Sequence, residues 1–449
     1  MPSFDIDKSD LLRLRGALDS TDVELQQVLD QYHASEIAIL FDRLEPEERE
    51  RIINILPAET ASEVISEMDE ESHPEELLVS LDKEKRTEIL KELDYDDATD
   101  IISQLDESDQ QEILDEIDQE DASNIRNLMT YQEDTAGGLM DTELIKVNIS
   151  CSKNEALEEI IRQSEQMEEF YTLYAVDDDG ILQGILSIKD LIKAKKQLYV
   201  KDLIKTDYVY VKADLDQEEV ARLISQYNLT SVPVVDDYMK LLGRVTVDDI
   251  IDVMEEENTE DILKISGVSE DEELSGNWQD AVKSRLPWLV LNLGTAFLAA
   301  AVIRHFSTIE AKLPVVMAYM TIISGMGGNS ATQALAVTVR RISLSDLTDQ
   351  QAYKTVLKEL SVGLINGAIN GLILLLFALW YDANPMLGLV LFMAMTGNLI
   401  VAGLTGSGIP LLLKRVGIDP AVASSIIITT FTDCFGFLLV LWLASKLLL

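Results

Sequence analysis

A twelve-residue repeat organises the first third of the chain. An apolar residue followed by aspartate recurs four times at this spacing, as Leu81-Asp82, Leu93-Asp94, Leu105-Asp106 and Ile117-Asp118. Seven residues after each aspartate stands an isoleucine, at Ile89, Ile101, Ile113 and Ile125. Aspartate is a preferred N-cap residue, so the pattern predicts one short capped helix per repeat, with its isoleucine buried. Helices stacked in this way form an α-helical superhelix, which we expect over residues 1–135.

Residues 136–254 contain a second repeat, in which short β-rich runs alternate with helical patterns. The run Met140–Val147 corresponds to Ile204–Val211, and a helical pattern follows each copy. Each copy closes on the pattern G-x-apolar-S/T-x-x-D, at Gly184–Asp190 and at Gly243–Asp249. Strands and helices that alternate over such short distances predict a tandem pair of small α/β modules.

The last part of the chain, residues 281–449, is mostly apolar and predicts a transmembrane domain of five helices. Each apolar stretch is long enough to cross a ~30 Å hydrocarbon core at ~1.5 Å per residue. The five stretches are Leu286–Ile303, Leu313–Val339, Val362–Trp380, Met386–Leu413 and Val422–Lys446. The chain is therefore expected to be a multidomain membrane protein, with residues 255–280 connecting the α/β pair to the membrane helices.

Basic residues flank these stretches unevenly. Lys and Arg are concentrated on the flanks that share a side with the N-terminus, for example at Arg340, Arg341, Lys414 and Arg415. Basic loops stay on the cytoplasmic side. We therefore expect a multi-pass protein of the cell (inner or plasma) membrane, in contact with lipid, with its N-terminus in the cytoplasm.

Charge is distributed as unevenly as hydrophobicity. Of 36 Lys/Arg and 80 Asp/Glu in the chain, only 11 bases and 7 acids lie from Ala281 onward. The excess of acidic residues before Ala281 argues against nucleic acid as a partner, because nucleic-acid affinity depends on basic residues that neutralise phosphates. It attracts cations instead. A solubility or high-salt adaptation is the alternative explanation of the same charge.

Two polar positions inside the apolar stretches are candidate cation ligands. Asp433 is the only acid deep inside the five stretches, and no base is within reach along its own helix. A carboxylate at that depth is costly unless it faces water or a cation. In the second stretch, Asn329 follows a glycine-rich run and lies four residues before Gln333, which predicts both amides on one helix face. The alternatives are a protonated or hydrogen-bonded structural Asp433 and, for the glycines, close helix packing.

The connecting helix, expected from about Asp248 to Ile265, has an acidic face. Four carboxylates fall on it at i, i+4, i+7 and i+8: Asp248, Asp252, Glu255 and Glu256. Like charges at this spacing repel, so the face favours a counter-ion. Sites made of oxygen atoms alone suit Mg²⁺, which keeps several waters and takes one or two carboxylates. A solvated acidic face without bound metal is the alternative.

The residues argue against an enzyme and leave three classes of transporter open. The histidines His33, His73 and His305 are scattered, and no nucleophile with its base and no phosphate-binding loop is apparent. A carrier of Mn²⁺ or Co²⁺ remains an alternative to a magnesium protein, since affinity alone does not exclude these ions. A nucleotide-regulated anion transporter is a further alternative, against which Asp433 argues.

The closing pattern of the tandem modules resembles the CBS domain. CBS pairs are regulatory modules that often bind adenine nucleotides between their halves. The resemblance implies a possible site for ATP or another adenine nucleotide. Its ribose-binding positions correspond to Thr246 and Asp249 in the second copy, and to Ser187 and Asp190 in the first.

The chain resembles the MgtE family of magnesium channels in the order of its four parts: the acidic helical repeat, the CBS pair, the connecting helix and the five apolar stretches. The run Gly327-Gly328-Asn329 with Gln333, and the final Thr-x-x-Asp433-x-x-Gly436 pattern, look like signatures of that family. The resemblance covers nearly the whole chain and departs at Ala331, where the family usually has glycine. It implies a homodimer that takes up Mg²⁺ through a pore between its membrane domains, with Asp433 and the main chain of Thr429 facing the hydrated ion.

The same resemblance implies a gate. The connecting helix would be a plug that closes the pore when cytosolic Mg²⁺ occupies the interfaces between the acidic domain, the CBS pair and the plug. The carboxylates expected to sense Mg²⁺ are Asp97, Asp100, Asp248, Asp252, Glu255 and Glu256.

Overall fold

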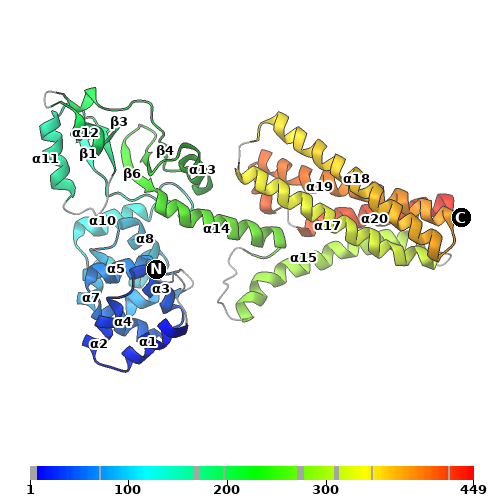
Figure 1. Ribbon diagram of the computed structural model, residues 1–449, viewed down its shortest axis with the longest axis horizontal. Coiled ribbons are helices and arrows are strands. Elements are labelled where there is room, and N and C mark those ends of the chain that lie inside the picture. The colour runs from blue at the N-terminus through cyan, green and yellow to red at the C-terminus, as the bar shows by residue number, and fades with distance from the viewer. Residues whose placement is uncertain are drawn as a thin grey trace. The chain divides into compact units, whose positions relative to one another are not determined.

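The computed structural model describes residues 8–69, 72–164, 171–195, 198–269, 278–307, 313–344, 347–422 and 425–449. These residues form two compact units, Met1–Met254 and Glu255–Leu449. Figure 1 shows short helices and two small sheets in the first unit, and long helices in the second.

Short helices of 7 to 11 residues make up the described N-terminal part (blue to cyan in Figure 1). Their bounds are α1 Lys8–Leu18, α2 Asp22–Leu29, α3 Ala34–Phe41, α4 Pro46–Ile55, α5 Ala58–Ser66, α6 Pro74–Ser80, α7 Lys83–Leu90, α8 Tyr95–Ser103, α9 Glu107–Leu114 and α10 Gln119–Leu128. Helices pack on the next helix but one: α3 on α5 and α5 on α7, then α4 on α6, α6 on α8 and α8 on α10. Two interleaved columns of this kind form the predicted superhelix.

The twelve-residue repeat has the predicted structural basis. All four repeat isoleucines are buried, with Ile113 only 1% exposed. The four repeat aspartates all stand at the N-cap positions of their helices. Among them, only the Asp82 carboxylate accepts a capping hydrogen bond, from the Lys85 backbone N–H at 3.0 Å. The position of the caps is therefore confirmed, while the bond itself is made at one of the four.

The tandem modules are two copies of one three-stranded sheet. In the first, β1 (Lys146–Asn148) lies parallel to β2 (Thr172–Val176), which pairs antiparallel with β3 (Leu182–Ser187). In the second, β4 (Val211–Lys212) lies parallel to β5 (Ser231–Val235), which pairs antiparallel with β6 (Leu241–Thr246). Helices α11 (Lys153–Gln163), α12 (Ile188–Lys193) and α13 (Gln217–Tyr227) accompany them. The register shifts at the same place in both sheets, which confirms the duplication.

The two copies are joined through the turns before β3 and β6. The Leu182 N–H donates to the Met239 carbonyl at 2.9 Å, and the Leu241 N–H donates to the Gly180 carbonyl at 3.1 Å. Tyr174 is 1% exposed and contributes to a core shared by both copies. The pair is therefore one packed body.

The second unit contains five long helices in its described residues. They are α15 Trp278–His305, α17 Pro314–Leu344, α18 Asp349–Tyr381, α19 Pro385–Arg415 and α20 Ser425–Leu447, with a short turn η4 at Pro420–Val422. Four of them, all but α17, are long and apolar enough to cross a membrane. Helix α17 has 31 residues, but its polar run from Ser324 to Gln333 lowers its hydropathy. It packs against α19, α20 and α18. Gly327 and Ala331 are buried in these contacts, whereas Asn329 and Gln333 are exposed.

Helix α14 (Val247–Ser266) follows directly on β6 and has 20 residues. It is the helix expected from Asp248 to Ile265. It ends before Gly267, which has a φ of 74°. Glycine adopts this left-handed conformation without strain and is the usual residue there.

Candidate functional site

A cavity of about 550 Å³ lies in the membrane domain between α17, α20 and the last turn of α14. It is lined by Ile265, Ser266, Ser324, Gly325, Gly328, Asn329, Thr332, Ser425, Thr429 and Asp433. The three positions predicted in the membrane domain, Asp433, Thr429 and Asn329, therefore come together in one cavity. Its other polar groups are hydroxyls, so the lining presents oxygen and amide atoms to a ligand.

Asp433 is held at the cavity wall by a neighbouring helix. Its Oδ1 accepts a hydrogen bond of 2.5 Å from the Ser324 hydroxyl of α17. Within the described residues no basic side chain forms an ion pair with it. A partly solvated carboxylate without a protein counter-ion is suited to a hydrated cation. Sequence reasoning did not single out Ser324, whose bond spans 109 residues of sequence.

Thr429 uses its hydroxyl within its own helix. The hydroxyl donates to the Ser425 carbonyl at 2.6 Å, and the Thr429 carbonyl accepts from the Thr432 hydroxyl at 3.0 Å. The same carbonyl lies inside α20, where the backbone N–H four residues later also bonds it, so both of its lone pairs are engaged. Gly328 makes room opposite, because a Cβ there would lie 3.1 Å from the Thr429 methyl carbon.

The C-terminal half of α14 is attached to the membrane helices by polar contacts. The Ser343 hydroxyl donates to Asp261 at 3.1 Å, and the Arg340 guanidinium donates to Asn258 at 2.6 Å. Lys264 pairs with Asp419 at 3.0 Å. Ile265 packs beside the apolar cluster of α17, α19 and α20, and it reaches the cavity of Asp433.

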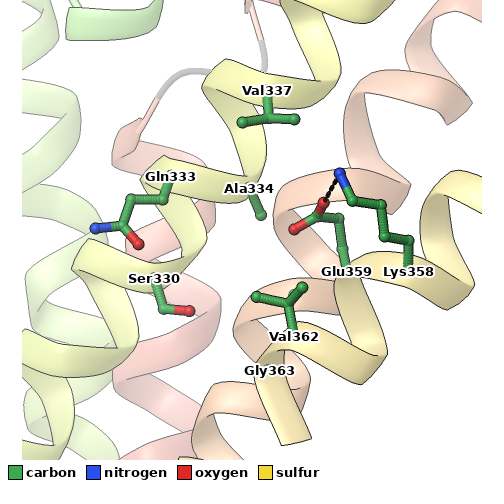
Figure 2. A pocket seen from close by; sticks show the side chains of 9 residues that line it. Ser330, Gln333, Ala334, Val337, Lys358, Glu359, Val362 and Gly363 are labelled. Atoms are coloured by element: carbon green, nitrogen blue, oxygen red, sulfur yellow. Dashed lines mark ion pairs between the residues drawn. The ribbon is translucent and has the colours of Figure 1, made fainter. Parts of the chain in front are cut away.

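A second cavity of about 250 Å³ lies on another side of α17, between α17, α18 and α19. Figure 2 shows Ser330 of α17 and Glu359 of α18 in its lining, and the Glu359 carboxylate pairs with Lys358. The Lys358 Nζ lies 3.6 Å from Glu359 Oε1, and Glu359 is 7% exposed. Helix α18 begins at Asp349, thirteen residues before the apolar stretch that starts at Val362, and Glu359 lies in this earlier part. The expectation that Asp433 is the only acid deep inside the spans stays a prediction.

Gln333 lines this second cavity, whereas Asn329 lines the first. The two amides lie four residues apart on one face of α17, yet they line different cavities. Four residues advance an α-helix by about 40° beyond a full turn. That offset is enough to direct the two side chains to different cavities.

In the first unit, carboxylates from α8, the chain before β1 and the start of α14 interact with one another. Burial and the nearby Asp94, Asp249 and Asp141 raise the pKa of Asp97 to about 7. Burial also raises the pKa of Asp141 to about 7, against the opposing effects of a backbone hydrogen bond and of Arg244. The Arg244 guanidinium contacts Asp141 Oδ2 at 3.1 Å. Elevated pKa values of this kind mark carboxylates that lack sufficient positive charge.

The structure brings some of the predicted sensor residues into this group and leaves others apart. Asp97 interacts with Asp249, and Asp248 interacts with Asp94. Asp100 lies one turn beyond Asp97 on α8 and is half-buried. The remaining three candidates are exposed on α14: Asp252, Glu255 and Glu256. Within the described residues, no three His, Cys, Asp or Glu side chains converge closely enough to hold a metal ion by themselves.

Thr246 and Asp249, the predicted ribose-binding residues, hydrogen-bond to each other. The Asp249 carboxylate accepts from the Thr246 hydroxyl at 2.5 Å and from the Thr246 backbone N–H at 3.1 Å. This arrangement resembles a capping box at the start of α14. Burial raises the pKa of Asp249. The two residues thus have a structural role already, in addition to any contact with nucleotide.

Comparisons with known proteins agree with this architecture. The family model of the MgtE divalent cation transporter matches residues 320–443, and that of the MgtE intracellular N domain matches residues 32–134. The CBS domain model matches residues 136–197 and 200–256.

Named relatives and solved structures point the same way. The chain is 36% identical to magnesium transporter MgtE of Enterococcus faecalis, over 72% of this chain and 71% of the relative. It is 34% identical to magnesium transporter MgtE of Thermus thermophilus, over 73% of each chain. It is similar to the cytosolic domain of the Mg²⁺ channel MgtE in complex with ATP, with 36% identity and a TM-score of 0.52. That match covers 54% of this chain and 99% of the other. The chain therefore belongs to the MgtE family of divalent cation transporters.

Proposed function

We propose that this protein is a magnesium channel that admits Mg²⁺ to the cell and closes when cytosolic Mg²⁺ is high. The observation that carries the proposal is the cavity of Asp433, Asn329 and Thr429, which the last turn of α14 also lines. A single cavity thus combines the groups expected to contact the ion with the segment expected to block its way.

The donor set favours a hard, hydrated dication. Carboxylate, hydroxyl and amide groups suit Mg²⁺, which is retained through its waters and one or two carboxylates. Among the described residues that line the cavity there is no thiol, so none of them selects a softer metal. Passage of Mn²⁺ or Co²⁺ remains the alternative to be tested. An anion transporter is disfavoured, because the charge that faces the cavity is the negative charge of Asp433.

The acidic group of the first unit supports the closing step. Asp141 and Asp249 both repel the charged form of Asp97, and a dication that bridges these carboxylates relieves the repulsion. Bound Mg²⁺ would stabilise the arrangement in which α14 begins beside these carboxylates. Closure follows only if Mg²⁺ binds this arrangement more tightly than the open one. Asp100, Asp252, Glu255 and Glu256 are further proposed ligands.

A homodimer completes the pathway in this proposal. The described cavity contains one carboxylate, Asp433, which is a poor match for a dication. A twofold axis beside the cavity would supply a second carboxylate. We further propose that the protein lies in the cell membrane, in contact with lipid, with its N-terminus in the cytoplasm.

Adenine nucleotide is the proposed regulatory ligand of the CBS pair. A similar cytosolic domain has been solved with ATP. Thr246 and Asp249 are the residues proposed to hold its ribose, by exchanging part of their mutual hydrogen bonding for contacts with the nucleotide.

Flux into liposomes tests the proposal directly. Wild-type protein and Asp433→Ala would be reconstituted, and Mg²⁺ influx measured while Mg²⁺ on the cytoplasmic face is varied. The expected result is influx that requires Asp433 and stops at high internal Mg²⁺. Flux that does not depend on internal Mg²⁺ would support the proposed channel but contradict the proposed gating by Mg²⁺. Absent Mg²⁺ flux with persistent Co²⁺ flux would identify a carrier of another ion.

A further inference from the structure

A buried amide lies behind the cation cavity, on a helix that does not line it. Asn398 of α19 has no exposed surface. Its Nδ2 donates a hydrogen bond of 3.0 Å to the Ile323 main-chain carbonyl of α17. Its Oδ1 is also buried, and it has no hydrogen-bond partner among the described residues. From the sequence alone, an asparagine beside Gly397 in the fourth apolar stretch predicts no more than close helix packing.

Two glycines make room for this amide, one on each of the helices α17 and α20. A Cβ on Gly327 of α17 would overlap the Asn398 Nδ2, and a Cβ on Gly436 of α20 would lie 2.9 Å from the same atom. Contacts below about 3 Å are not made by real Cβ atoms. The amide is therefore inserted between α17 and α20 at a point where a Cβ on either helix would displace it.

The insertion point adjoins the Ser324–Asp433 hydrogen bond. Ile323, whose carbonyl accepts from Asn398, directly precedes Ser324. Gly436 lies three residues, less than one helical turn, after Asp433. A shift of either helix at the amide would therefore move the hydroxyl or the carboxylate that it bonds.

Stability alone does not explain an amide at this position. A buried polar atom without a partner costs folding free energy, and an apolar side chain of similar volume avoids that cost. The unpartnered Oδ1 thus makes asparagine a poorer choice for packing than leucine. What asparagine provides, and leucine does not, is the directional bond to the Ile323 carbonyl.

We infer that Asn398 is a positioning residue for cation passage, which fixes α17 relative to α20 and so sets the place of the Asp433 carboxylate. The inference rests on the proposed function of that carboxylate. Asn398 does not itself touch the ion, because it lies outside the cavity lining. It acts through the main chain of α17 and the close contact with Gly436.

The test compares Asn398→Leu with wild type, using full-length protein in liposomes and in detergent. We measure the Mg²⁺ concentration that gives half-maximal flux, the ratio of Mg²⁺ to Ca²⁺ flux, and the melting temperature. Asn398→Leu should melt no lower than wild type, yet require about fivefold more Mg²⁺ for half-maximal flux, the factor expected for one lost hydrogen bond. The ratio of Mg²⁺ to Ca²⁺ flux should also fall.

The matched control is Ser407→Ala. Ser407 is also fully buried on α19, but its hydroxyl bonds only within that helix, to the Gly403 carbonyl at 2.6 Å. This variant should retain the wild-type half-maximal Mg²⁺ concentration and selectivity. Gly436→Ala, which displaces the amide, should shift both quantities in the same direction as Asn398→Leu.

The outcomes separate this inference from the proposed function. Asp433→Asn is expected to alter both the Mg²⁺ dependence and the selectivity of flux. If it does, and a folded Asn398→Leu protein behaves like wild type in both, the positioning role is overturned. If Asp433→Asn also left them unchanged, the proposed cation pathway itself would be wrong. Should the leucine variant fail to fold, Asn398→Ala, which introduces no clash, takes its place, and wild-type behaviour there equally overturns the inference.

Discussion

The Ser324 hydroxyl donates a hydrogen bond of 2.5 Å to the Asp433 carboxylate, joining α17 to α20 across the cavity wall. The bond fixes one carboxylate oxygen and leaves the other for solvent or an ion. The bond therefore holds the carboxylate in a fixed orientation.

Removing that hydroxyl should weaken cation passage without removing the carboxylate. We expect Ser324→Ala to reduce Mg²⁺ flux by about tenfold, since hydrogen bonds to charged groups are worth about 1.5–3 kcal/mol. Ser361→Ala is the control, because the Ser361 hydroxyl bonds only the Leu357 carbonyl of its own helix, at 2.8 Å. Flux through Ser324→Ala at the wild-type level would show that the bond has no part in orienting Asp433.

The carboxylates of the first unit predict an unusual dependence of stability on pH. The pKa values of Asp97 and Asp141, raised by burial to about 7, exceed the value of about 3.9 for an unfolded aspartate. The native state therefore binds more protons than the unfolded state between these values. Its stability falls as pH rises from about 4 to about 7 in the absence of Mg²⁺.

Calorimetry of the full chain in detergent checks this dependence. The transition of the first unit should move to lower temperature as pH rises through the window, and Mg²⁺ should raise it more at about pH 8 than at about pH 5. The double variant Asp97→Asn, Asp141→Asn should flatten the pH dependence. A transition temperature that instead rises with pH would contradict the raised pKa values of these two carboxyls.

A buried ion pair in the N-terminal superhelix predicts a large loss of stability. Arg86 donates to Glu116 at 2.8 Å, and both side chains are 9% exposed. Arg86→Ala leaves Glu116 buried without its main partner and should destabilise the folded domain by about 3 kcal/mol. The control is Arg162→Ala, which breaks an exposed pair with Glu159 and should not measurably change the transition. Equal effects of the two variants in calorimetry would refute the distinction.

The second CBS copy is expected to bind nucleotide through Asp249. Asp249→Ala should weaken ATP binding by more than about tenfold and also cost about 1 kcal/mol, through lost capping of α14. Asp190→Ala, at the corresponding position of the first copy, should change ATP affinity much less. Equilibrium dialysis of the full chain measures the affinity. Equal losses of ATP affinity in the two variants would contradict the proposal that the second copy holds the ribose.

Local sequence signals predicted the elements of this fold well. The N-cap at Asp82 and the burial of Ile89 depend on residues a few positions apart. Both could therefore be predicted from the twelve-residue repeat. The five apolar stretches correspond to five helices, although the helices extend well past the apolar stretches. Hydropathy detects only the apolar part of a helix, which is why it places Glu359 outside the third span. The four-part division at residues 135, 254 and 280 stays a prediction.

Residues that act across long sequence distances were not accessible in the same way. The partners of Asn398 and Ser324 lie 75 and 109 residues away in the sequence. No periodicity encodes such a contact, and an asparagine or a serine in an apolar stretch is compatible with ordinary helix packing. Asp433 was found because an isolated charge in a membrane helix is costly wherever its neighbours lie.

The interleaved columns of the N-terminal superhelix have a mechanical consequence. Along both columns each helix contacts the next but one, so a small rotation at one step is passed to the following step. Angles that change by a little at each helix add up over the column. Small rotations distributed over both columns would thus change the curvature of the domain while each helix stays intact.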